Sequence, residues 1–250
     1  MSRRSRLIPV LALIACAAGT APGQPPETDS SIEFQKQIAL GRQLAQELDR
    51  AGSITDPAIV DYLGRVADRV AGAAGVRPFQ IRVMRGPGRY ANLLPHGVLY
   101  ISAELLERIE SEAELAGLFA HVLGHGREPA NPAQGSGGTP HGTWLPCVLA
   151  TPEAPPGLGE NRRESERLAT GQAIEMLRAA DYDPTAVLDL LSKLAYENPA
   201  WGKAIDPDDL LDFRGTLEAE VPPKGGFVVT SSAFALERAL MMKTLGVGAR

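Results

Sequence analysis

The sequence is poor in cysteine, and the scarcity excludes one class of fold. Its 250 residues include two cysteines, Cys16 and Cys147. Cys16 lies in a segment that we expect to be processed, so Cys147 has no partner within the chain and a disulfide-supported fold is excluded. Burial as a small hydrophobic side chain is the favoured state of Cys147.

The sequence also lacks an excess of basic residues. Lysine and arginine number 25 against 30 aspartates and glutamates, which gives a formal net charge of -5. This balance argues against nucleic acid as the main partner. With 44% hydrophobic and 22% charged residues, the chain is long enough to build one sizeable core.

The first sixteen residues have the composition of an export signal. Three arginines (Arg3, Arg4 and Arg6) precede a short apolar run from Leu7 to Ala15. This run is too short to span a membrane as a stop-transfer helix. The segment therefore predicts a signal peptide at residues 1–16.

The signal ends in Leu-Ile-Ala-Cys, which has the form of a bacterial lipobox. This pattern predicts lipidation of Cys16 and an exported lipoprotein of the cell envelope or periplasm, attached to a membrane by its lipid. The alternative is ordinary cleavage near Ala17 or Ala21. Residues 17–31, rich in Pro, Gly, Gln, Thr and Ser, predict a flexible tether.

Apolar periodicity predicts a mainly helical α+β domain over residues 32–245. Helix-start signals include Asp56-Pro57, and alternation of apolar and polar residues marks two short strands. Helices are expected at about 34–48, 56–72, 111–125, 164–180 and 183–194, with a short one at 210–213 and a final one near 234–240; the strands are expected at 79–83 and 98–102, with an extended segment at 227–229.

Residues 126–160 interrupt the domain with an irregular segment. They contain seven prolines and the run Gly-Ser-Gly-Gly at 135–138. So long a stretch without periodicity predicts an insertion in the form of a surface lid or a poorly ordered loop.

A helix with two histidines carries the first sign of chemistry. Ser111 followed three residues later by Glu114 forms a capping-box start. His121 and His125, four residues apart, lie on one helix face, where two imidazole nitrogens can share one metal ion. Two imidazoles do not complete a zinc site. Glu166 on the next long helix, 41 positions after His125, is the best candidate for a third ligand.

The order of these motifs resembles the peptidase M-48 family, the HtpX- and Oma-like gluzincin zinc metallopeptidases, in its exported bacterial members. The resemblance covers about residues 32–240 and is carried by YANLLPHGVLYIS, SEAELAGLFAHVLGH and ESERLATGQAIEMLRAADYDP. These resemble the family patterns N-A-x-x-x-P-G-G, S-E-x-E-L-A-x-x-x-x-H-E-x-x-H, and E-x-x-A-D followed by G-Y-D-P.

The resemblance implies a zincin-like metallopeptidase domain with a small sheet packed against the metal-site helix. It implies one zinc ion held by His121, His125 and Glu166, and a cleft that binds a polypeptide substrate or client protein.

The departures from the family pattern are concentrated at the positions that carry out or support catalysis in the family. Val122 stands where the family has its general-base glutamate, and Thr170 stands where an aspartate orients a metal-binding histidine. On the expected substrate-binding strand, Tyr90 replaces an asparagine and His96 a glycine. Loss of a general base typically costs about two to four orders of magnitude in rate, so ordinary peptide hydrolysis is not expected.

The sequence supports three hypotheses. The first is a proteolytically inactive descendant that binds extended polypeptide by strand addition without cutting it. The second is an active zinc metalloendopeptidase in envelope protein quality control, with Glu164 or metal-bound hydroxide replacing the base. The third is a metal-free structural or interaction module, in which the histidine pair simply packs under a loop. His141 is either incidental or a substitute ligand.

Overall fold

The computed structural model describes most of the predicted domain. It covers residues 52–54, 56–76, 79–85, 88–94, 97–125, 159–197, 203–220 and 225–245, with six further helical residues between 39 and 50. The predicted signal peptide, Cys16, the tether, His96, His141 and Cys147 lie outside the described residues. Within those ranges, no helix combines the length and the apolar character needed to cross a bilayer.

The described chain is mainly helical with one small sheet, which confirms the α+β class. The elements run in the order β1 (Ser53–Ile54), α2 (Pro57–Ala73), β2 (Gln80–Met84), β3 (Ala91–Leu94), β4 (Val98–Ser102), α3 (Ala103–Leu106), α4 (Glu112–His125), α5 (Gly159–Ala179), α6 (Thr185–Glu197), α8 (Pro207–Glu218) and α9 (Ser232–Leu245).

The sheet has the strand order β1-β2-β4-β3. β2 and β4 are parallel, whereas β1 and β3 pair antiparallel with their neighbours. Alternate residues face opposite sides of a strand. One face, with Leu99 and Ile101 of β4, joins the main core, and the other, with Tyr100, packs against Ala45.

Several element boundaries differ from the sequence-based expectation. α5 begins at Gly159 rather than Glu164, because its first turn is polar and has no apolar periodicity to reveal it. α8 covers twelve residues instead of the expected four, and it begins where the Asp206 side chain caps the helix before Pro207. The two-residue strand β1 was not expected, because so short a strand has no readable alternation.

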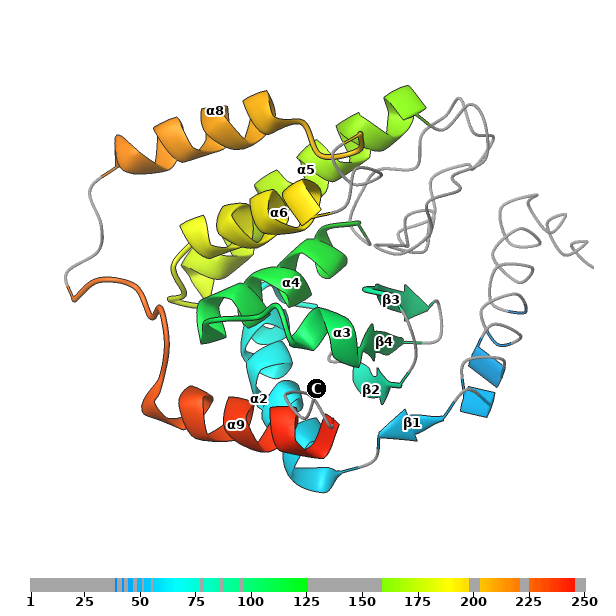
Figure 1. The fold of residues 1–250 in the computed structure, drawn as a ribbon. Helices are drawn as coiled ribbons and strands as arrows, with labels where there is room; N and C mark the ends of the chain where they lie inside the picture. The colour runs from blue at the N-terminus through cyan, green and yellow to red at the C-terminus, as the bar shows by residue number, and fades with distance from the viewer. Residues whose placement is uncertain are drawn as a thin grey trace, which may run out of the picture.

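Helix α4 occupies the centre of the domain, between α5 and α6 on one side and α2 and the sheet on the other (Figure 1). Every residue from Glu112 to Gly124 is buried. Two glycines permit close packing on both sides. A Cβ atom at Gly117 would lie 3.1 Å from the Cα of Val187 in α6, and Gly124 is closer still to α5.

The first turn of α4 contains a buried carboxylate, Glu112. It accepts hydrogen bonds from the hydroxyls of Tyr62 at 3.0 Å and Tyr182 at 2.9 Å, and from Ser231. Burial and the neighbouring carboxylate raise the pKa of Tyr182 to about 12, so this phenol stays protonated and remains a donor. The positive end of the helix dipole also favours the charge of Glu112. One side chain thus joins α4 to α2, to the α5–α6 connection and to the segment before α9.

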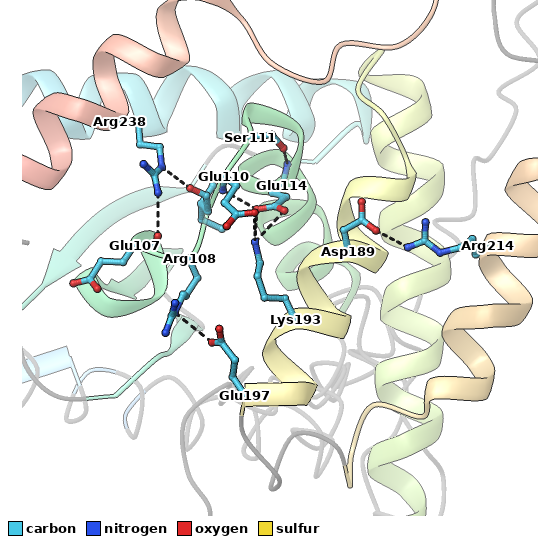
Figure 2. A network of polar contacts seen from close by, with 11 residues as sticks. Glu107, Arg108, Glu110, Ser111, Glu114, Asp189, Lys193, Glu197, Arg214 and Arg238 are labelled. Carbon is cyan, nitrogen blue, oxygen red and sulfur yellow. Dashed lines mark hydrogen bonds and ion pairs between the residues drawn. The ribbon is translucent and has the colours of Figure 1, made fainter. Parts of the chain in front are cut away.

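Polar contacts also hold the loop that enters α4, as Figure 2 shows. The Ser111 hydroxyl accepts from the Glu114 N–H at 3.0 Å, which confirms the predicted cap, while the Glu114 carboxylate accepts from the N–H of Glu110 rather than of Ser111. Lys193 of α6 lies 3.1 Å from Glu114, and Arg238 of α9 donates to two carbonyl oxygens of the loop. The N-terminus of α4 is therefore held from two sides.

Replacing Glu112 by alanine should lower the free energy of unfolding by about 2–4 kcal/mol, because buried tyrosine hydroxyls lose their acceptor. Glu110→Ala is the matched control, since its side chain is 70% exposed and its ion pair with Lys193 is worth at most about 1 kcal/mol. Urea unfolding followed by circular dichroism measures both. Equal losses in the two variants would contradict the assignment of Glu112 as a buried anchor.

Candidate metal centre

Three side chains from two helices converge on one point. The Nε2 atom of His121 lies 3.0 Å from an Oε atom of Glu166 and 3.2 Å from Nε2 of His125. The third side of this triangle, from His125 Nε2 to Glu166 Oε, measures 3.3 Å. The sequence separated Glu166 from the histidines by a long irregular segment, and the fold brings the three together into a group that can hold a metal ion.

The geometry of this triangle is compatible with three ligands that share one metal ion. Each imidazole Nε2 has a single in-plane bonding direction, so it cannot point a hydrogen at two partners at once. Tetrahedral ligands with bonds of about 2.0–2.2 Å lie roughly 3.3–3.6 Å apart, and the observed separations of 3.0, 3.2 and 3.3 Å are slightly shorter than that range or at its lower end. Among the described residues, two imidazoles and one carboxylate supply three ligands, the number that catalytic zinc sites take from the protein.

The electrostatic environment favours an ionised carboxylate and a cation. Burial of Glu166 favours its neutral form, but hydrogen bonds and charge from His121 and His125 outweigh this and hold the pKa of Glu166 well below its usual range. His125 is the last residue of α4. The negative end of the helix dipole therefore lies at the ligands, where it stabilises positive charge.

Close contact between α4 and α5 sets the distance between the ligands. A Cβ atom at Gly124 would lie 2.6 Å from the carbonyl oxygen of Ala169 and 2.9 Å from its Cα. No other residue type fits there without moving a helix backbone. Gly124 lies between the two histidines in sequence, and Ala169 lies three residues after Glu166. The contact thus holds the two ligand-bearing helices at the separation that the triangle requires.

The residue after the first histidine is apolar and belongs to the core. Val122 is 1% exposed and packs within the main hydrophobic cluster. Its isopropyl group cannot accept a proton. The position that holds a general base in the H-E-x-x-H pattern therefore contributes packing in this protein.

The Thr170 hydroxyl is directed at its own helix. It donates to the carbonyl oxygen of Glu166 at 2.7 Å, the back-bonding common for Thr four residues along a helix. The Thr170 hydroxyl therefore does not donate a hydrogen bond to a histidine.

Tyr90 packs on the sheet face opposite to the face that joins the α4 core. Its N–H donates to the Ser102 side chain at 3.0 Å, which ties the start of β3 to the end of β4. His96, the other residue predicted on the substrate-binding strand, lies outside the described residues.

A serine next to Glu166 contacts the site and was missed by sequence reasoning. The Oγ atom of Ser165 lies 3.3 Å from Nδ1 of His125. Neither spacing nor the resemblance pointed to it, because the contact depends on how α5 is rotated against α4.

Glu164, which was considered as an alternative general base, is exposed. Residues two apart on a helix do not share a face, so Glu164 is directed away from the side of Glu166.

No protein-family model and no curated protein matches this chain. The candidate site therefore rests on its own geometry: the ligand triangle, its burial and the close contact between the two helices that carry it.

Replacing Gly124 by alanine should separate α4 from α5 and weaken the site. Overpacking of this kind costs about 1–3 kcal/mol of stability, and the displaced ligands should bind zinc less tightly in a chelator competition. Gly64→Ala in α2 is the control: a Cβ there meets nothing within 4 Å, so this change should stabilise the protein by about 0.5–1 kcal/mol. Unchanged zinc affinity in Gly124→Ala would show that the contact does not set the ligand distances.

Proposed function

We propose that this protein is a zinc-binding, zincin-like protein that does not hydrolyse peptide bonds, and that it binds extended polypeptide beside its metal centre. One observation carries the proposal: a three-ligand triangle of His121, His125 and Glu166 lies next to a buried valine. Zinc bound there would supply a Lewis acid. The chain's own residues would hold it with three ligands and supply no base at Val122.

The ligand chemistry supports zinc as the metal. Imidazole nitrogen and carboxylate oxygen are both zinc ligands, and a set of two histidines and one glutamate is known from catalytic zinc sites. The site is closed to bulk water on most sides, because His121 is 1% and Glu166 8% exposed. A buried ionised carboxylate needs positive charge nearby, which a metal ion or a protonated imidazole can supply.

The sheet edge supports the polypeptide part of the proposal. Among the strands described here, β3 pairs with β4 alone and packs against α4, the helix that bears both histidines. An edge strand presents backbone N–H and C=O groups that an extended peptide can pair with. Export and membrane attachment through a lipidated Cys16 belong to the same proposal and rest on the sequence.

The geometry favours this function over an active endopeptidase. The substitute base Glu164 is exposed and lies on another face of α5, and Thr170 bonds its own helix. A metal-free interaction module explains the burial of three polar side chains less well than a metal site does. The three functions differ in the zinc content and in the cleavage activity that they predict.

The purified protein should contain one zinc ion per chain. His121→Ala and Glu166→Gln should lose it, because each removes a ligand, while His141→Ala should keep it. Elemental analysis and competition with a chromogenic chelator measure the zinc content.

The zinc-loaded protein should also leave an unfolded substrate such as casein uncut, with no more cleavage than the His121→Ala variant shows. Cleavage that a chelator abolishes would establish the endopeptidase instead, and absence of zinc would establish the metal-free module.

Val122→Glu should restore the general base that the site lacks. A glutamate at this position follows the first histidine as in H-E-x-x-H, so zinc-dependent cleavage of casein should appear in this variant and disappear with chelator. Val122→Gln is the control, because it has a similar size and polarity but is a far weaker proton acceptor. Equal activity of the two variants would contradict a role for the missing base.

A further inference from the structure

Ser165 contacts the metal centre from the side that faces away from the ligands. Its Oγ atom lies 3.3 Å from Nδ1 of His125, while Nε2 of the same ring faces His121 and Glu166. The two nitrogens of an imidazole lie on opposite sides of the ring. Ser165 and the other two ligands therefore hold the His125 ring between them.

The positions of the nitrogens decide which one carries hydrogen. Nε2 of His125 points at the other ligand atoms, so its lone pair is the one available to a metal. A neutral imidazole has one N–H, which must then be on Nδ1. The Ser165 oxygen is placed to accept it. Metal-binding histidines usually donate this second N–H to a carboxylate, carbonyl or water.

The two histidines differ in how much packing holds them. The side chain of His121 is 1% exposed, whereas that of His125, at the end of α4, is 10% exposed. The surrounding core restricts the His121 ring. The His125 ring is less enclosed than the His121 ring, so a polar contact matters more for its orientation.

We infer that Ser165 is a positioning residue for His125, and the inference rests on the proposed zinc binding. The serine hydroxyl accepts the Nδ1–H hydrogen bond, fixes the ring tautomer and keeps Nε2 aimed at the metal position. Ser165 precedes Glu166 on α5, so this helix supplies one ligand and orients another. Thr170, whose proton is donated to the Glu166 carbonyl, does not provide this support.

The experiment compares Ser165→Ala and Ser165→Thr with the wild-type protein. Zinc affinity is measured by competition with a chromogenic chelator. Ser165→Ala should bind zinc about 10–100-fold more weakly, the range typical for loss of such a contact. Ser165→Thr keeps the hydroxyl and should bind nearly as the wild type does. Ser192→Ala, at an exposed serine of α6, should leave the affinity unchanged.

A second measurement reads the hydrogen bond itself. In zinc-loaded protein with ¹⁵N-labelled histidine, long-range ¹H–¹⁵N spectra assign the tautomer of His125 and the exchange of its Nδ1–H. The wild type and Ser165→Thr should show a protected Nδ1–H. Ser165→Ala should show faster exchange, with no change in the melting temperature of the zinc-free protein.

The outcomes separate the two proposals. Wild-type protein without zinc would overturn both zinc binding and the role of Ser165. Wild-type zinc binding together with unchanged affinity and unchanged Nδ1–H exchange in Ser165→Ala would overturn only the role of Ser165. Equal losses of affinity in the alanine and threonine variants would also overturn it, because the hydroxyl would not be the cause.

Discussion

The separation of α4 and α5 is the constraint on which the candidate site depends. Two ligands lie on one helix and the third on the other, so an error of an ångström in that distance would break the triangle. The absent side chain at Gly124 allows the backbones to meet at Ala169. Close packing at Gly124 therefore sets the helix separation that allows the three ligand atoms to share one ion.

The other end of α4 is fixed by polar groups, and the two ends serve different purposes. Glu112 and Glu114 receive hydrogen bonds and an ion pair from α2, α6 and the segment before α9. These contacts set the position of the helix along its axis. With that position fixed, His121 and His125 lie level with Glu166 of α5, within reach of its carboxylate.

Sequence reasoning succeeded where a structural signal is local. Helix periodicity placed both histidines on one face, and the caps at Asp56 and Ser111 marked two helix starts that the structure confirms. Glu166 was selected by a resemblance and by the need for a third ligand. The partners of Glu112 and the contact of Ser165 with His125 were not predicted. Both depend on how distant segments pack, and no spacing within one element encodes that.

The contacts at the start of α4 also have a consequence for the order of folding. Ser231 bonds Glu112, the N–H of Ala113 donates to the carbonyl oxygen of Val229, and Arg238 holds the preceding loop. All three partners lie more than 100 residues after the start of α4 in the sequence. A growing chain can form the helix that bears the histidines but cannot lock it in place. The start of this helix is therefore held only once residues 229–238 have been made, well after both histidines and Glu166.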